Sequence, residues 1–188
     1  QTDSKILIGG GFSTINGNSI SNFARLNQDG TTDGTFNIGN GANNTVGSIL
    51  VLPDNRICVG GSFSLFNGAS RPSLVRLQSD GSLDSSFKPV RISSNINSIV
   101  QLPNQKLLIG GNVNSNIDAA PRQKIIRLLE DGSVDFSFDV SGATFNGSSG
   151  QVFQLGVQSD GKILAAGQFD SLNGVARAGF ARLLTFTN

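Results

Sequence analysis

The sequence of 188 residues predicts an all-β fold, a β-propeller of about four antiparallel blades. Two observations carry this prediction: a repeat with a period of 51 residues, and short apolar runs separated by turn signals inside each repeat. No window shows the sustained periodicity of a helix. The length suits a single repeat domain, residues 1–188, that buries a sizeable core.

The repeat is visible in two segments of every unit. The first is a basic residue followed by an apolar run: KILIGGGF from Lys5, RICVGGSF from Arg56, KLLIGGNV from Lys106 and KILAAGQF from Lys162. The second contains an arginine, and these arginines are Arg25, Arg76, Arg127 and Arg182. They are 51, 51 and 55 residues apart. The spacing divides the chain into units 5–55, 56–105, 106–161 and 162–188, the last of them incomplete.

Each complete unit is predicted to supply four strands. We expect strand A over Val46–Leu52, strand B over Ile57–Phe63, strand C over Ser73–Gln78 and a short strand D around Phe87–Val90. The PDN, PNQ and DG segments are typical of tight turns. Strand C carries apolar side chains on both faces, so it must be covered on both sides. Four-stranded sheets covered by their neighbours are the blades of a propeller.

The consensus of the unit, VxSIxxLPDxKILIGGxFxxxNGxxxxxxxRLxxDGSLDxSF, resembles the delta-60 repeat of bacterial surface, secreted and phage-associated proteins. The resemblance extends over essentially the whole chain. It implies a propeller, and it brings no catalytic residues to this sequence. Two units depart from it locally. Unit three has NSNIDAAP near Asn116 in place of NG, and Val113 in place of phenylalanine, while unit four has AAG in place of the glycine pair.

The count of strands predicts an open arc of a larger propeller. The chain begins at strand B of unit one and ends soon after strand C of unit four, so the two terminal blades are incomplete. An arc leaves two apolar blade faces uncovered. We therefore expect further propeller blades to complete it, from the same longer chain or from another subunit. A closed ring of four blades is the alternative.

A recurring arginine and aspartate are predicted to form a buried ion pair in three of the units. The arginine lies in strand C between apolar neighbours, and a buried charge needs a partner. An aspartate follows eight residues later, which gives the pairs Arg25–Asp33, Arg76–Asp84 and Arg127–Asp135. We expect bidentate contacts, with the adjacent apolar space filled by Phe36, Phe87 and Phe138. A ring of ligand-binding arginines is the functional alternative.

The composition excludes several kinds of site. The chain has no His, Trp, Tyr or Met, and its single cysteine is Cys58. Catalytic triads, histidine metal sites and internal disulfides are thereby excluded. We predict no catalytic residue, no metal site and no cofactor. The glycine pairs lack the helix of a phosphate site, the DG segments are typical of turns rather than calcium loops, and Cys58 fits a buried apolar position.

The loops sort into two ends of the blades. Antiparallel strands place the short PDN, PNQ and DG turns at one end, which we call the turn end. The B–C and D–A connections share the other end, the long-connection end, and an insertion at 139–150 adds to it. Because loops on a rigid scaffold carry binding, we place the candidate site there. Its candidate residues are Asn16, Asn18, Asn67, Arg71, Asp118, Arg122, Asn146 and Asn173.

These features predict a non-enzymatic structural or interaction module of an extracellular, cell-surface or virion protein, such as an adhesin or a phage tail fibre. Abundant Gly, Ser and Asn favour that setting. We expect a protein or glycan partner. The net charge of +1 argues against nucleic acid, and no apolar run is long enough to insert into a membrane. The alternative is a glycan-active enzyme that uses carboxylates alone, among them Asp118, Asp139 and Asp170.

Overall fold

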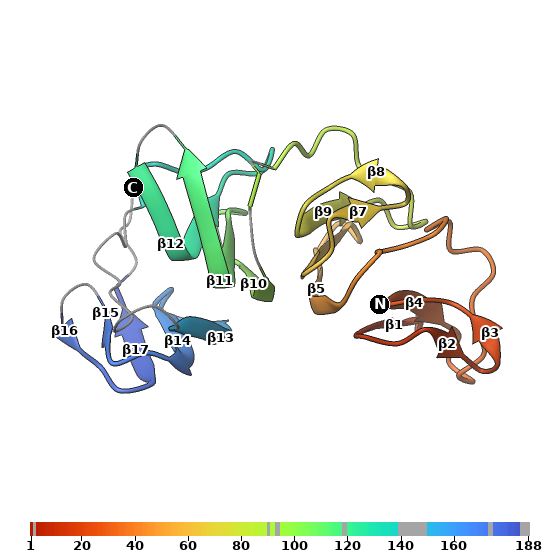
Figure 1. Cartoon of the computed structure of the whole chain (residues 1–188), viewed down its shortest axis with the longest axis horizontal. Helices are drawn as coiled ribbons and strands as arrows, with labels where there is room; N and C mark the ends of the chain where they lie inside the picture. The colour runs from red at the N-terminus through yellow and green to blue at the C-terminus, as the bar shows by residue number, and fades with distance from the viewer. Residues whose placement is uncertain are drawn as a thin grey trace.

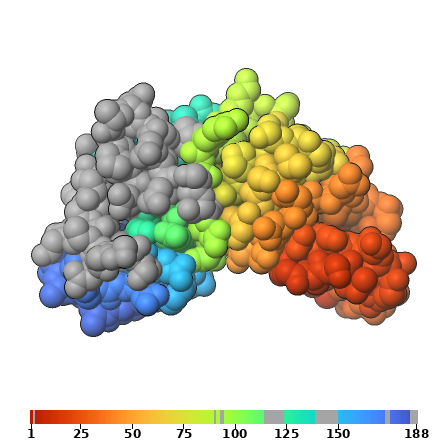
Figure 2. All heavy atoms as spheres, in the orientation of Figure 1, coloured from red at the N-terminus to blue at the C-terminus, as the bar shows by residue number. Residues whose placement is uncertain are grey.

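The strands form small antiparallel sheets that follow one another along an arc (Figure 1). The computed structural model describes residues 1, 3–89, 91–92, 95–117, 120–138, 150–172 and 175–184, and of 114–117 and 120–123 only the main chain is considered. The first and the last sheet lie at opposite ends of the arc, and a hollow separates them in the space-filling view (Figure 2). The two ends do not meet as they would in a closed four-bladed ring. Over the ranges just given, no helix has the length and hydropathy to cross a membrane.

Each of the larger sheets is one blade, and its strands follow the predicted order A, B, C. In the described part of the chain the first blade has two strands, β1 (Ile6–Gly9) and β4 (Phe23–Leu26). The strands of the second blade are β5 (Val46–Val51), β6 (Ile57–Gly61) and β9 (Leu74–Leu77). Those of the third are β10 (Ile96–Gln101), β11 (Leu107–Ile117) and β12 (Ala120–Leu128). Those of the fourth are β13 (Gln151–Val157), β14 (Ile163–Gln168) and β17 (Phe180–Leu183). The predicted all-β, antiparallel architecture is confirmed.

A small hairpin connects strands B and C in three blades. These hairpins are β2 (Thr14–Ile15) with β3 (Asn18–Ser19), β7 (Leu65–Phe66) with β8 (Ala69–Ser70), and β15 (Ser171–Leu172) with β16 (Val175–Ala176). Asn67 and Gly68 connect β7 to β8 with φ angles of 49° and 73°. A two-residue turn with both φ angles positive suits the NG sequence and the twist of a hairpin. In the third blade, which lacks NG, β11 and β12 run on as one long pair with a register shift between Gly110 and Asn114.

The predicted strand D is wrong as a strand. After β9 the chain makes a single bridge, from Leu77 to Leu83, and residues 87–89 form no strand ladder, although the N–H of Lys88 donates to the carbonyl of Asp131 in the next blade. The carboxylate of Asp84 accepts hydrogen bonds from the main-chain N–H and the hydroxyl of Ser86, at 2.9 and 2.6 Å. This local turn competes with the sheet for the backbone donor. Pro89 then has no N–H to give to a ladder. Val90 lies outside the described residues.

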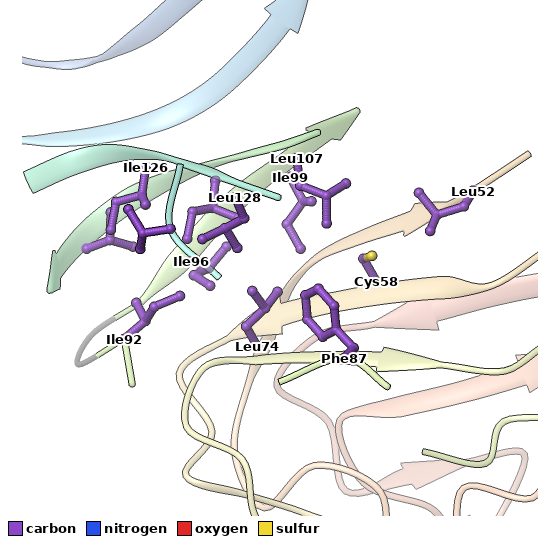
Figure 3. Close-up of a cluster of buried hydrophobic side chains, with 13 residues drawn as sticks. Leu52, Cys58, Leu74, Phe87, Ile92, Ile96, Ile99, Leu107, Ile126 and Leu128 are labelled. Atoms are coloured by element: carbon purple, nitrogen blue, oxygen red, sulfur yellow. The ribbon is translucent and has the colours of Figure 1, made fainter. Parts of the chain in front are cut away.

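The core consists of apolar layers between neighbouring blades. Successive residues of a strand point to opposite faces, so that Cys58 packs toward the third blade while Ile57 and Val59 pack toward the first. Figure 3 shows the layer in which Cys58 and Leu74 of the second blade face the apolar residues Ile96, Ile99 and Leu107 of the third. Strand C of the second blade is therefore covered on both faces, as the sequence predicted.

The glycine pairs make these layers thin. A β-carbon added at Gly60 would lie 2.6 Å from Cγ2 of Ile96 on the third blade. A β-carbon at Gly61 would collide with the carbonyl of Thr45, where β5 bulges between Val46 and Ser48. The first glycine of a pair therefore admits the next blade, and the second admits the bulge of its own strand A. Close backbone approach and a β-bulge therefore explain why both positions of the pair hold glycine.

Strand A of one blade is also hydrogen-bonded to strand A of the next. The Ser48 hydroxyl accepts from the N–H of Ile99 at 3.0 Å, and the Ser98 hydroxyl accepts from the N–H of Leu155 at 3.0 Å. Ser98 is buried, so that its bond is shielded from water. A polar contact between neighbouring strands A in each of these two layers helps to fix the height at which successive blades stack.

The fourth blade has two unlike faces. Its face toward the third blade is apolar and buried. On the opposite face it has Gln154, Gly156 and Gln158 at the positions that hold Ser98, Val100 and Leu102 in the third blade. Phe180 occupies the position of buried Ile125 and is 56% exposed. The regular layer pattern therefore stops at this outer face.

Candidate functional site

Three arginines of strand C are buried and contact the aspartate eight residues later. The Nε atoms of Arg25, Arg76 and Arg127 donate to these aspartate oxygens at 2.7, 2.6 and 2.7 Å. Each guanidinium also lies 4.2 to 4.6 Å from the centroid of the phenylalanine ring that follows in its unit. Each arginine therefore pairs with the aspartate that the spacing of eight residues predicted.

The contact is single rather than bidentate, because each guanidinium divides its donors. Nη1 of Arg25 donates to the main-chain oxygen of Ser79 at 2.7 Å, and Nη1 of Arg76 donates to that of Glu130 at 2.6 Å. Both carbonyls directly precede the DG turn of the following blade. Each of these two arginines therefore ties its own blade to the next one.

A third charged group joins each pair, and the sequence analysis missed it. The basic residue that opens each unit reaches the same aspartate, as the pairs Lys5–Asp33, Arg56–Asp84 and Lys106–Asp135 show, at 3.3, 3.5 and 2.7 Å. The recurrence of Lys or Arg immediately before strand B is the signal that could have predicted it. The aspartate is thus shared by two cations from adjacent strands.

The aspartates of these clusters are ionised at neutral pH. Burial opposes the charge of Asp84, but hydrogen bonds from Ser86 and then Arg76 outweigh it and lower the pKa of Asp84 from 3.8 to about 2. The hydroxyl of Thr35, followed by Arg25 and Lys5, likewise lowers the pKa of Asp33 against the effect of burial. Charged, internally satisfied and buried, these clusters act as scaffold rather than as a ring of ligand-binding arginines.

A pocket at the turn end, between the second and third blades, is electrically balanced. It measures about 430 Å³ and is lined by Asp54, Arg56 and Glu130, among others. Arg56 donates to Asp54 at 2.6 Å and to Glu130 at 3.2 Å. Because its charges are satisfied by one another, this pocket offers little to a charged ligand.

At the long-connection end, the hairpin of one blade packs on the connection that leaves the previous blade. Phe66 forms an isolated antiparallel β-bridge with Ala42, and the N–H of Asn67 donates to the carbonyl of Gly41 at 2.7 Å. The side chain of Asn43 accepts from the N–H groups of Ser64 and Leu65, both at 2.9 Å. B–C and D–A connections therefore meet in space, as the strand directions predict.

Two pockets occupy equivalent places beside strand C, one in each of the first two blades. The first measures about 430 Å³ and the second about 270 Å³. Both have apolar floors, Phe23 with Phe36 in the first and Leu74 with Phe87 in the second. Both are walled by the residues before strand C and by the connection to the next blade.

The rims of these pockets differ in charge. The first is lined at its rim by Ser19, Ile20 and Asn40, which are uncharged, and its only charged lining residues among those described are Arg25 and Asp33, which pair with each other. The second is lined by Arg71, Lys88 and Arg91. Arg71 is half-buried, and its Nη1 donates to the carbonyl of Ser70 at 3.0 Å. The two blades thus place different chemistry on one framework.

The remaining candidate residues have varied places. Asn16 donates to the carbonyl of Gly30 at 2.8 Å, Asn18 is exposed, and Asn67 forms the hairpin turn. These residues belong to the long-connection loops, although Asn16 also contacts a DG turn through Gly30, and they do not converge with Arg71 on the pocket that it lines. The candidates outside the described residues, or described only in their main chain, are Asp118, Arg122, Asn146 and Asn173.

The described residues also bear on nucleophile and metal chemistry. Burial raises the pKa of the Cys58 thiol to about 12, so that it is protonated and apolar in character. Across the described ranges no three of Asp, Glu, Cys and His gather as metal ligands would. Of the carboxylates considered for glycan chemistry, Asp170 is exposed, and Asp118 and Asp139 lie outside the described residues.

A family model described as "Domain of unknown function (DUF5122) beta-propeller" matches residues 1–36, 52–87, 102–138 and 158–185. These segments, one for each predicted unit, make up more than half of the chain. The protein belongs to the DUF5122 beta-propeller family. A propeller repeat family is therefore shown, as the repeat resemblance implied.

Among solved structures, the DUF5122 chain is similar to the WD40 beta-propeller domain of Doa1, with a TM-score of 0.59 and 16% sequence identity. The match covers 91% of this chain and 46% of the other, so that the DUF5122 chain spans about half the length of that propeller chain. At this level of identity the similarity shows the fold alone. No curated protein matches the sequence.

Proposed function

We propose that this DUF5122 propeller is a non-enzymatic interaction module that binds a protein partner at its long-connection end. The observation that carries the proposal is the pair of equivalent pockets in the first two blades, which share a framework and differ at the rim. A rigid scaffold with variable loops at one end is the usual arrangement of a binding protein.

The described aspartates favour binding over catalysis because they already have structural duties. Asp33, Asp84 and Asp135 hold the buried arginines. The aspartates of the DG turns bind the side chain two residues later in the same turn, as Asp80 does with Ser82 at 2.7 Å. A carboxylate fixed in this way is a poor general acid, because the charged form is stabilised. A carboxylate-only glycan-active enzyme is therefore the less favoured proposal.

The proposal includes the setting of the module. The apolar residues of β1 and β4 that face away from the second blade include Ile6, which is 46% exposed, and Phe180 is exposed at the other end of the arc. We propose that further blades, from a longer chain or another subunit, cover these faces. The finer resemblance to the delta-60 repeat supports an extracellular, cell-surface or virion location.

A binding survey tests the function. The purified chain is applied to a peptide array and to a glycan array, and each bound probe is tested again with Asn18→Ala and Leu65→Ser. Both residues are exposed on the long-connection hairpins. We expect peptide binding that weakens with either variant and is unchanged with the control Asn104→Ala, an exposed residue of a turn-end loop. Hydrolysis of any glycan, or peptide binding that is sensitive to the turn-end control alone, would contradict the proposal.

A further inference from the structure

The pocket of the second blade gathers three cations without a carboxylate. Arg71, Lys88 and Arg91 line it together with Ser70, Pro72 and the apolar floor, and no Asp or Glu is among the described residues of its wall. Arg71 comes from the connection before β9, whereas Lys88 and Arg91 come from the connection toward β10. The fold therefore brings together charges that are separated in sequence.

These cations differ from the basic residues of the scaffold. Lys5, Arg25, Arg56, Arg76, Lys106, Arg127 and Lys162 each contact an aspartate or glutamate within 4 Å. In the part of the chain that the structure describes, Arg71, Lys88 and Arg91 have no such contact. Like charges held close together repel one another, and an anion between them relieves that repulsion.

The equivalent pocket of the first blade shows that the fold does not require these charges. The residues 51 positions before Arg71, Lys88 and Arg91 are Ile20, Asn37 and Asn40. The main-chain contact is nevertheless the same. The N–H of Asn37 donates to the main-chain carbonyl of Asp80 at 2.7 Å, and the N–H of Lys88 donates to that of Asp131 at 2.8 Å. The scaffold forms with neutral residues here, so the cations serve another purpose.

The shape and chemistry of the pocket indicate the size of its ligand. A volume of about 270 Å³ is smaller than a typical drug-sized site and suits one or two side chains. The floor of Leu74 and Phe87 accepts methylene groups, and a planar guanidinium such as that of Arg71 matches a carboxylate. An aspartate or glutamate side chain combines both features.

We propose that this pocket, which we call the cationic pocket, binds an acidic segment of the protein partner by enclosing one of its carboxylate side chains. The inference rests on the proposed function and gives the partner a chemical character. Arg71 contacts the carboxylate, while Lys88 and Arg91 attract the neighbouring acidic residues. The net charge of +1 hides this polarity, because the 13 acidic residues of the chain offset its 14 basic ones.

Fluorescence anisotropy with a labelled hexa-aspartate peptide tests the cationic pocket, with a hexa-asparagine peptide as the neutral probe. We expect hexa-aspartate alone to bind, more weakly as salt is added, and the variant R71Q/K88Q/R91Q to lose about tenfold or more in affinity. The matched control is Arg177→Gln. Arg177 occupies the same place in the fourth unit, and its Nη1 also donates to the preceding carbonyl, that of Ala176, at 2.8 Å. Affinity should be unchanged in this control.

A gain of binding provides a second and independent arm. Asn37→Lys combined with Asn40→Arg places cations around the first-blade pocket, and we expect it to add a hexa-aspartate site to the R71Q/K88Q/R91Q chain. Equal affinity of the wild type and R71Q/K88Q/R91Q would overturn the proposal. So would tight binding of a heparin hexasaccharide without any binding of hexa-aspartate, since the ligand would then be a sulfated glycan.

The failure of this inference is distinguishable from that of the proposed function. If hexa-aspartate does not bind while array peptides remain sensitive to Asn18→Ala or Leu65→Ser, the cationic pocket is wrong and the binding module stands. If hexa-aspartate binds and depends on Arg71, the cationic pocket is supported whatever the arrays give.

Discussion

The turn end and the long-connection end of this propeller are built from the same repeats and behave differently. At the turn end the arginine, aspartate and phenylalanine cluster recurs with nearly the same distances in three units. Toward the long-connection end, the residues before strand C and in the connection to the next blade place neutral side chains at the rim of the first pocket and cationic side chains at the rim of the second. Phe36 and Phe87 of the clusters form part of the floors of these pockets. The difference shows that one end of each blade maintains the stacking while the other is free to vary in chemistry.

Removing a turn-end arginine should produce the largest effect. Arg76→Ala removes the charged donor that lies 2.6 Å from the carboxylate of Asp84, together with a donor to the carbonyl of Glu130, in a buried layer. We expect a loss of about 3–5 kcal/mol in the free energy of unfolding, measured by urea denaturation. Arg71→Ala, at the other end, should change it by less than about 0.5 kcal/mol. Equal urea midpoints for the two variants would remove the distinction between the ends.

A small side chain at the first glycine of a pair should disturb a layer. In Gly60→Ala the new methyl group lies 2.6 Å from Cγ2 of Ile96 and 2.9 Å from Cδ1 of Ile99, so that the third blade must shift. We expect a destabilisation of about 1–3 kcal/mol by overpacking, measured by thermal unfolding. The fourth blade has Ala166 at this position, and Ala166→Gly should cost about 1 kcal/mol or less. A Gly60→Ala chain as stable as wild type would contradict the close approach of the blades.

Acid should weaken the turn end selectively. The pKa of Asp84 is about 2 in the folded chain and 3.8 ordinarily, so its ionised form stabilises the fold above about pH 4. That contribution is lost as the pH falls toward 2, and it amounts to about 2 kcal/mol for this one group. Urea midpoints measured along this range should fall, and they should fall less steeply for Asp84→Asn. Constant stability down to pH 2 would show that the cluster contributes nothing.

The smallest effect concerns Cys58, whose reactivity measures how often the layer between the second and third blades opens. Its side chain is fully buried and burial raises its pKa to about 12, so that the thiol is neither exposed nor ionised. We expect a thiol reagent to modify unfolded chain completely while native chain reacts only through opening of the layer. Gly60→Ala should speed the reaction, and Arg71→Gln should not. Rapid modification of native wild type would contradict the packing shown in Figure 3.

The sequence predicted the blades well because their packing depends on residues that recur. The spacing of eight between arginine and aspartate is kept by the single bridge and turn that follow strand C, so the pairs could be read from the repeat. The glycine pairs likewise mark the two close approaches of strand B in the second and third blades. Strand D was predicted wrongly because apolar residues such as Phe87 pack into the layer from a turn rather than from a ladder.

The cationic pocket could be predicted only in part. Arg71 was a candidate because it lies in a long connection, but Lys88 and Arg91 are 17 and 20 residues away in sequence. Their proximity depends on how the connection toward β10 runs back beside β9, which no spacing rule gives. An alignment of the units would have given a signal, because Arg71, Lys88 and Arg91 of unit two replace the uncharged residues Ile20, Asn37 and Asn40 of unit one.

The recurrence of the same contacts between successive blades has a consequence for how such a chain can change in length. A gene segment of one period could be duplicated or lost without a new interface having to arise, because the contacts recur between blades: the serine contact from the second blade to the third and from the third to the fourth, and the arginine contact from the first to the second and from the second to the third. Each inserted copy would carry its own pocket and turn it by one further step around the arc. Valency and angular spacing of binding sites could therefore be adjusted by copy number alone, as in other repeat arrays.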